Sequence, residues 1–219
     1  VKTLEDVYGV TPPPLAGRIR ELLMLGQLVQ NQATSLFFFT MPDKLHTASI
    51  FGAEEKESND ALGSISKKAM AVRKIGTELI QVAGGQFIHP VKAIVGGVVS
   101  GIEKDAAQKM RDKIREALPL ACSLFDEYWH LSRKMAQSVG NWVGDDPFYY
   151  MMAVDKNDPT LPVDYVTMQK NDGSETVTFK PNEYKKFLQF HTVQDSFSSK
   201  TSFKDLPIRA NSLARMNMI

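Results

Sequence analysis

Two glycine pairs, Gly84-Gly85 and Gly96-Gly97, bracket a stretch that cannot continue as regular helix. Glycine suits backbone that turns to positive φ or approaches another element closely. Pro90, near the centre, lacks an amide donor and disfavours helix at His89. The stretch nevertheless carries core-type side chains, namely Phe87, Ile88, Val91, Ile94 and Val95. We therefore expect residues 84–97 to form a long buried loop around which the rest of the chain is organised.

Helical patterns flank this loop on both sides. Apolar side chains recur at three- or four-residue intervals over residues 15–41, 62–80 and 103–139. Thr11 is placed to cap the first of these helices, and Pro42 should stop it. The loop is expected to thread between the first helix and the third.

The second and third helices have their own boundary signals. Gly84 is a plausible C-cap for the second helix, and the run from Ser100 to Glu103 has the pattern of a capping box for the third. Pro119 should kink the third helix or divide it. A cluster of basic residues in the second helix is expected to be a solvated face, because no aromatic residues interleave it: Lys67, Lys68, Arg73 and Lys74.

The pattern changes after residue 145. Strands are expected over residues 148–154, 163–168 and 176–179, with turn chemistry at residues 171–174 before the last of them. A short helix should run from residue 181 to residue 190, followed by an irregular tail. We expect an α+β fold that is mainly α. Residues 1–145 would form a helical bundle core with the buried loop, and residues 146–219 a small antiparallel β-containing region.

Charge and cysteine content exclude several classes of protein. A formal net charge of +1 gives no field that would select nucleic acid. Residues 22–42 carry no charge but include too many glutamines, serines and threonines for a membrane span. A single cysteine, Cys122, excludes a disulfide framework and fits a reducing compartment, so we expect a cytoplasmic protein. The first residues lack a signal-peptide pattern and suggest a chain that begins inside a longer protein.

No set of residues has the spacing of a metal site or a nucleophilic centre. The four histidines are dispersed, at His46, His89, His130 and His191. His89 is expected to fix the loop by bonding its backbone, with a proton-relay role as the alternative. Cys122 is expected to be a small core residue, with a nucleophile as the alternative. No phosphate-binding loop or dinucleotide fingerprint appears.

Several stretches, in order along the chain, carry a family resemblance. They are Thr40-Met41-Pro42-Asp43, Arg73-Lys74-Ile75-Gly76, the run from Gly84 to Val91, Gly96-Gly97-Val98, and Ser212-Leu213-Ala214-Arg215-Met216-Asn217. Together they resemble the large subunit of nickel-iron hydrogenases, with the closest likeness to the soluble, cofactor-coupled members. The resemblance implies reversible oxidation of H2 at a nickel-iron centre. It also implies, as partners, electron-acceptor subunits and a small iron-sulfur subunit.

The same family holds its metals with two C-x-x-C motifs, and this chain has neither. Thiolates suit nickel and iron, and one cysteine cannot replace four. The resemblance therefore implies a central fragment that binds no metal by itself. Such a fragment should expose apolar surface and could self-associate.

Only Asp43 can be matched to a functional position of that family. The resemblance assigns it the carboxylate that lies just beyond the metal-holding residues and tunes proton transfer; the alternative is an ordinary helix-terminal carboxylate. One departure stands nearby, because the family's histidine-containing run is replaced by residues 31–35, Asn-Gln-Ala-Thr-Ser. Gln32 and Ser35 cannot carry a proton near neutral pH as histidine does. A non-catalytic scaffold, as in respiratory-complex subunits of similar fold, is therefore the alternative function.

Overall fold

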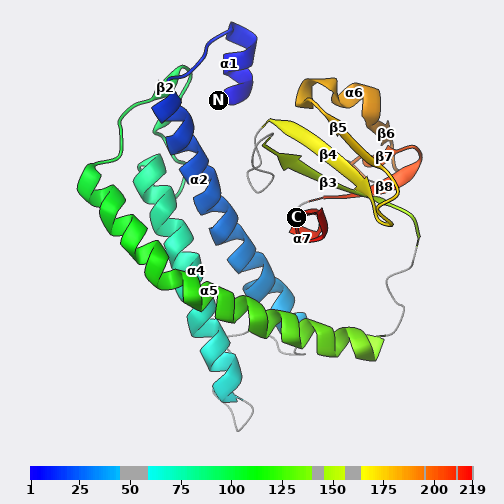
Figure 1. The fold of residues 1–219 in the computed structure, drawn as a ribbon, viewed down its shortest axis with the longest axis horizontal. Coiled ribbons are helices and arrows are strands. Elements are labelled where there is room, and N and C mark those ends of the chain that lie inside the picture. The colour runs from blue at the N-terminus through cyan, green and yellow to red at the C-terminus, as the bar shows by residue number, and fades with distance from the viewer. Residues whose placement is uncertain (45–58, 140–145, 156–163, 195, 211, 219) are drawn as a thin grey trace. The chain divides into compact units, whose positions relative to one another are not determined.

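The computed structural model describes residues 1–44, 59–139, 146–155, 164–194, 196–210 and 212–218 (Figure 1). The chain divides into two compact units, Val1–Gly140 and Asn141–Ile219. The first unit is built from long helices and the second from a β-sheet with short helices. The prediction of a mainly helical α+β fold is confirmed.

The first unit opens with a short helix, α1 (Lys2–Tyr8), which ends at Gly9 in the left-handed conformation, φ 64°. The long helix α2 (Pro14–Ala33) follows, and Pro13 is its N-cap. The expectation that Thr11 would cap this helix is wrong. In the first turn of a helix a backbone N–H has no intrahelical acceptor, so proline loses no hydrogen bond by lacking that group. The helix therefore starts within the proline run instead.

Helical structure continues beyond α2 without a break. A π-helix, η1 (Thr34–Thr40), leads directly into α3 (Met41–Lys44). The prediction that Pro42 stops the helix is therefore wrong, since Pro42 lies inside α3. In an α-helix its ring would clash with the carbonyl of Phe38, four residues earlier. The wider π turns immediately before it shift the carbonyl positions, and we attribute the continuation of the helix to this shift.

The second long helix, α4 (Asn59–Gly84), crosses α2 at two glycines. A Cβ atom at Gly26 would lie 3.1 Å from the carbonyl oxygen of Gly76, and a Cβ at Gly76 would lie 2.6 Å from the amide nitrogen of Gln30. The two backbones touch: a side chain does not fit at Gly76, and at Gly26 a Cβ would fit only if its neighbours shifted. The core beside the crossing is formed by Phe37, Met41, Ile65, Ala69 and Leu124. The predicted end of α4 near Gly84 is confirmed; Gly85, with φ 89°, takes the left-handed position after it.

The third long helix, α5 (Lys104–Val139), contains Pro119 without being divided by it. Figure 1 shows α5 changing direction about midway along its length, as expected for a proline kink. The helix begins at Lys104, three residues later than a cap at Ser100 predicts. Gly101 is a poor helix former and its carbonyl accepts a hydrogen bond from Lys92 Nζ at 3.4 Å instead. Among the described helices none is both long and apolar enough to cross a membrane.

The loop between α4 and α5 is not buried, which corrects the central sequence prediction. It folds back on itself as a short antiparallel pair, β1 (Ala93–Ile94) with β2 (Gly97–Val98). Ile88, Val91 and Val99 are 67%, 59% and 66% exposed. The hairpin satisfies part of its own backbone, and it packs on α2 rather than threading between α2 and α5. In the described part of the first unit, nothing covers its apolar outer side.

The second unit is a six-stranded sheet in the order β5-β4-β3-β8-β7-β6. The three strands expected from the sequence are β3 (Tyr149–Val154), β4 (Tyr165–Lys170) and β5 (Thr176–Phe179). The turn before β5 is confirmed: Asp172 Oδ1 accepts the Ser174 amide at 2.9 Å. The expected helix after Pro181 is shorter than predicted, with η2 (Pro181–Glu183) and α6 (Tyr184–Phe187).

The expectation of an irregular tail is wrong. Three more strands follow, β6 (Gln189–His191), β7 (Lys200–Phe203) and β8 (Leu206–Ala210), and then a helix, α7 (Ser212–Met218). Lys204 and Asp205 join β7 to β8 with φ of 50° and 63°. Positive φ at both central residues is the geometry of a tight hairpin turn. Such turns usually contain Asn-Gly, so Lys204-Asp205 gave no sequence signal for this hairpin. Because β8 pairs with β3 in parallel, the sheet is mixed rather than purely antiparallel.

Candidate functional site

Asp43 lies near the end of the long helical run of the first unit. Met41 and Pro42, just before it, are buried, whereas Asp43 itself is exposed. Its carboxylate is therefore carried by a backbone that is anchored in the core. A rigid support with an exposed acidic group is what a carboxylate acting on a neighbouring site would need.

The π-helix that precedes Asp43 is tied to α4. Thr34 Oγ1 donates to the carbonyl of Gln30 at 2.7 Å and accepts from Arg73 Nε at 3.1 Å. Thr40 Oγ1 donates to the carbonyl of Ser35, five residues earlier, at 2.9 Å. π-helical turns are rare and occur often at functional sites. The sequence did not predict this feature; the signal that could have indicated it is a proline at residue 42 inside an otherwise uninterrupted helical pattern.

His89 sits at an exposed position of the loop with φ 54°. Its backbone carbonyl accepts a hydrogen bond from Gln86 Nε2 at 2.7 Å. Among the described residues, no hydrogen bond to the imidazole ring is found. The expectation that the ring would satisfy buried backbone is therefore wrong: the backbone of His89, not its side chain, is used to shape the turn.

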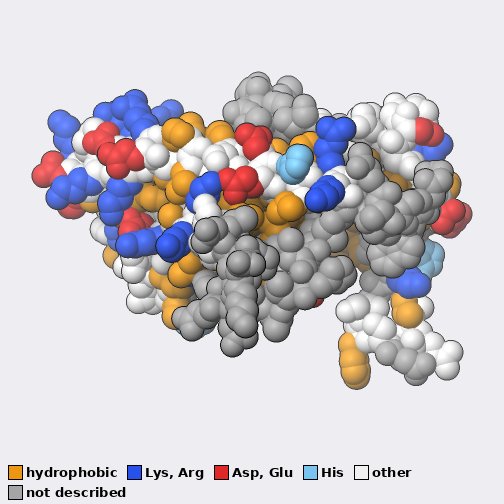
Figure 2. Space-filling view, turned by 90° about the horizontal axis from the view of Figure 1, so that it is seen from below, with side chains coloured by type: hydrophobic (Ala, Val, Ile, Leu, Met, Phe, Trp, Pro, Cys, Tyr) orange, Lys and Arg blue, Asp and Glu red, His pale blue; other side chains and the backbone are white. Residues whose placement is uncertain are grey.

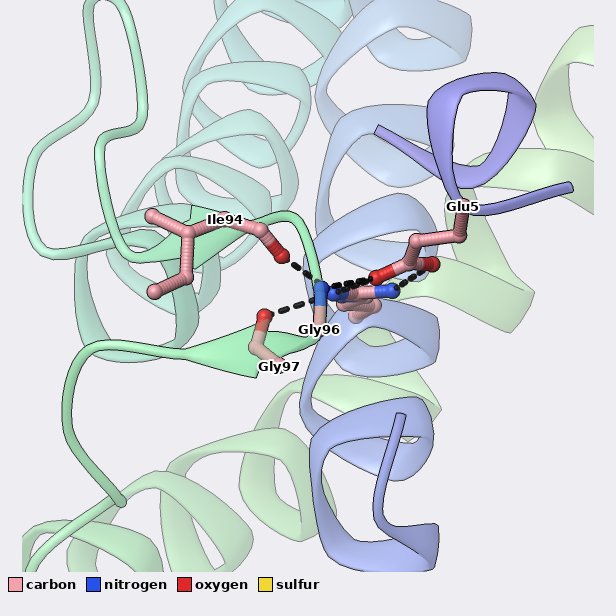
Figure 3. A network of polar contacts seen from close by, with 5 residues as sticks. Glu5, Ile94, Gly96 and Gly97 are labelled. Atoms are coloured by element: carbon pink, nitrogen blue, oxygen red, sulfur yellow. Dashed lines mark hydrogen bonds and ion pairs between the residues drawn. The ribbon is translucent and has the colours of Figure 1, made fainter. Parts of the chain in front are cut away.

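The loop is held instead by a buried ion pair that the sequence did not indicate. Arg20 donates from both terminal nitrogens to the Glu5 carboxylate, each at 2.7 Å, and from Nη2 to the carbonyls of Ile94 and Gly97, each at 2.6 Å. Glu5 also accepts the amide of Gly96 at 2.7 Å. Figure 3 shows these groups converging, with Glu5 reaching from α1 toward the turn between β1 and β2.

The electrostatics of this Glu5–Arg20 clamp favour its charged form. Glu5 is only 2% exposed. Hydrogen bonds from Arg20 hold the pKa of Glu5 below its ordinary value, against the opposing effect of desolvation, and the Gly96 amide adds to the lowering. The same pairing raises the pKa of Arg20. Its members are 15 to 91 positions apart in the chain, so no local spacing could have revealed them.

The structure does not bring Asp43 and His89 together. The loop is fastened to α2 near its beginning, at Arg20, whereas Asp43 follows 23 positions later on one continuous helical run. At about 1.5 Å per residue, this places Arg20, where the loop is fastened, roughly 30 Å from Asp43. In the described part of the chain there is no group of three or more His, Cys, Asp or Glu side chains that could hold a metal ion. Cys122 is exposed on α5, so the expectation that it is a core residue is wrong.

The second unit contains a buried tyrosine paired with a carboxylate. Tyr149 is 2% exposed, and its hydroxyl donates to Glu175 Oε2 at 2.6 Å. Lys204 Nζ donates to the other oxygen of Glu175 at 2.5 Å. Burial first, and the Glu175 carboxylate second, raise the pKa of Tyr149 to about 12. This hydroxyl stays protonated at neutral pH, so we assign Tyr149 a role in stabilising the sheet and not in proton transfer.

The opposite face of the same sheet carries an open groove. It has a volume of about 480 Å³, and it is lined by threonines and Gln169 from β4 and β5 and by Met152 and Met218. Thr167 and Thr178 hydrogen-bond to each other across the strands at 3.0 Å. The groove holds no charged cluster, so its geometry gives no indication of a reaction.

Comparison with known proteins shows sequence similarity to hydrogenase subunits. No protein-family model matches the chain. A component of the vhu F420-non-reducing hydrogenase of Methanococcus voltae is 26% identical over 225 residues, covering 100% of this chain and 53% of the relative. The alpha component of sulfhydrogenase 1 of Pyrococcus furiosus is 24% identical over 99% of this chain and 47% of its own length. The chain thus spans about half the length of the curated relatives it matches.

The fold gives the same result. The crystal structure of an NAD+-reducing [NiFe]-hydrogenase in the H2-reduced state matches 94% of this chain with a TM-score of 0.77 and 19% identity, over 48% of its own length. At that identity the likeness concerns the fold alone. The chain is therefore similar along its whole length to hydrogenase subunits of about twice its length, and its fold is similar to about half of an NAD+-reducing [NiFe]-hydrogenase chain.

Proposed function

We propose that this chain is the central part of a hydrogenase large subunit whose complete form oxidises H2 reversibly to protons and electrons. The observation that carries the proposal is similarity to hydrogenase subunits along the whole chain, joined to a matching fold over 94% of it. Helices α2, α4 and α5 would be the scaffold of that subunit.

The nickel-iron centre expected in the complete subunit does not fit the residues of this chain. Such a centre calls for soft thiolate ligands. The chain has one cysteine, and Cys122 is exposed on α5 with no second donor of its kind. We infer that the ligands come from parts of the polypeptide outside this chain, and that this chain contributes the surrounding scaffold.

Asp43 is the residue of this chain that we assign to the reaction, as a carboxylate just beyond the metal-holding groups. Buried Met41 and Pro42 fix the position of its backbone. Such a carboxylate can accept and orient a proton-carrying partner, and its loss typically costs about 10–100-fold in activity. His89 stays a weaker candidate, because its loop is fastened at Arg20, about 30 Å from Asp43 along the helical run.

The Asp43 assignment is tested in the full-length subunit. Asp43→Asn should lower H2-dependent dye reduction by about 10–100-fold while the nickel content stays unchanged. Asp6→Asn, an exposed carboxylate in α1, is the matched control and should leave both quantities unaltered. Full activity in Asp43→Asn would mean that Asp43 is only a helix-terminal carboxylate with no role in the reaction.

The expected partners are electron-acceptor subunits and a small iron-sulfur subunit, working in the cytoplasm. These follow from the proposed activity, because electrons taken from H2 must leave the large subunit through a conductor. Purification of the full-length protein with nickel analysis tests the whole proposal. We expect near-stoichiometric nickel and H2-dependent dye reduction; a nickel-free, inactive protein would contradict it.

A non-catalytic scaffold is the second candidate, and one observation favours it. Gln32 and Ser35 stand where histidines would offer proton carriers, on the same helical run as Asp43. The complete reading frame separates the two functions. Two C-x-x-C pairs flanking this segment are expected for the enzyme, and their absence would favour the scaffold.

A further inference from the structure

The outer side of α5 carries an apolar stripe that the described part of the first unit leaves open. Ile114, Leu118, Phe125 and Trp129 are 37%, 60%, 45% and 48% exposed, and Cys122 is exposed among them. The rings of Phe125 and Trp129 stack on each other, with centroids 6.4 Å apart and planes 12° from parallel. Figure 2 shows hydrophobic side chains reaching the surface between charged ones on the helical unit. We call these five residues the outer stripe.

The outer stripe is distinct from the face by which α5 packs on the rest of its unit. At about 100° per residue, its five members fall within roughly 80° of arc and span roughly 23 Å. The inward face is marked by buried Met110 and Leu124, and its centre lies roughly 100° around the helix from the centre of the stripe. A surface helix needs one apolar stripe, and a helix with two belongs between two layers. The outer stripe therefore predicts a second neighbour for α5.

Charge along the edge of the stripe indicates the chemistry of that neighbour. Arg115 and Arg133 are 18 positions apart, about five turns, so they lie on one line beside the stripe. Both are exposed, and within the described chain neither has an ion pair or hydrogen bond. Arg111 lies on the same side and donates to Gln108 at 2.7 Å, while two acidic residues, Asp112 and Asp126, lie within about 60° of this row. Guanidinium groups in a row match carboxylates on a partner.

We infer that the outer stripe is the binding surface for an amphipathic helix with an acidic flank. This helix is supplied by the half of the large-subunit polypeptide that lies outside this chain. The inference rests on the proposed function. The relatives are about twice as long as this chain, so they contain an equal amount of polypeptide that must pack somewhere. Stacked aromatic rings flanked by arginines are typical of the central contacts of such an interface.

Cys122 provides a direct measurement, because it lies within the outer stripe and is the only cysteine of the chain. Alkylation by iodoacetamide is timed at the Cys122 peptide by mass spectrometry, in residues 1–219 and in the full-length polypeptide. We expect fast alkylation in residues 1–219, independent of protein concentration, and at least tenfold slower alkylation in the full-length form. Equal rates in the two proteins would overturn the inference. Slow alkylation in residues 1–219 would also overturn it, since the cover would then be this chain itself or a second copy.

Two double variants sharpen the test. Leu118→Ser with Trp129→Ser should weaken packing of the proposed helix on the outer stripe and restore fast alkylation in the full-length form. Glu116→Ser with Lys134→Ser, on exposed positions on the far side of α5, is the matched control and should keep Cys122 protected. Protection that persists in the first variant would count against the outer stripe. Nickel content, measured on the same samples, reports on the proposed function alone. Nickel together with a reactive Cys122 would refute only the helix-binding surface. A protected Cys122 without nickel would refute only the proposed hydrogenase function.

Discussion

At Gly96 the backbone takes φ 86°, and its amide donates to buried Glu5. An L side chain in this conformation is strained wherever it points, and the cost is about 1–3 kcal/mol. We expect Gly96→Ala to lower the free energy of unfolding by that amount in a denaturant titration. Gly101→Ala is the control, because that glycine has ordinary φ and a Cβ there meets open space. Equal midpoints for the two variants would mean that the clamp does not fix the loop.

Tyr149 makes the second unit sensitive to alkaline pH. Its folded-state pKa is raised from 10.0 to about 12, so folding favours the protonated hydroxyl. That contribution to stability is complete below pH 10 and is lost as pH rises toward 12. Wild-type protein should therefore lose more stability over this range than Tyr149→Phe, measured by denaturant titration at each pH. Tyr184→Phe, at a 39% exposed position, should behave like wild type.

At the scale of elements, the crossing of α2 and α4 depends on glycine at two positions. A Cβ at Gly76 would meet backbone atoms of Gln30 and Gly26 at 2.6 and 2.8 Å, and backbone cannot rotate away. Gly76→Ala should therefore separate the helices and cost about 1–3 kcal/mol. Gly63→Ala, in the same helix with open space around it, should instead stabilise by about 0.5–1 kcal/mol. Thermal unfolding of both variants checks the opposite signs.

Elements with strong local periodicity could be predicted from the sequence. The positions of α2, α4, α5 and the first three strands follow from apolar spacing, and the turn after β4 follows from Asn-Asp-Gly-Ser. The errors occur where a local rule meets a tertiary exception. Pro42 is accommodated by π turns, and Lys204-Asp205 forms a hairpin turn without the usual residues.

At the scale of the molecule, the candidate site is less accessible to sequence reasoning than the fold. Asp43 is identified only through family resemblance, because nothing in its local sequence separates it from a helix-terminal carboxylate. The Glu5–Arg20 clamp joins segments up to 91 positions apart, and pairing of that kind has no sequence period. The apolar loop is predicted to be buried because its composition is that of a core. Under the proposed function, polypeptide outside this chain would cover the loop, since the relatives have about twice this length.

Exposure of that loop predicts how the isolated chain behaves. Ile88, Val91, Ile94, Val95 and Val99 are each more than 40% exposed on one short hairpin segment. Water ordered around so much contiguous apolar surface makes association favourable. In analytical ultracentrifugation, the average mass of residues 1–219 should rise with protein concentration, and Ile88→Ser with Val91→Ser should reduce that rise by weakening the apolar contact. Both side chains are exposed, so the double variant should keep the stability of the wild type, as the denaturation midpoint will report. A monomer at every concentration, with no binding of a hydrophobic dye, would mean that this surface is too small or too divided to drive association.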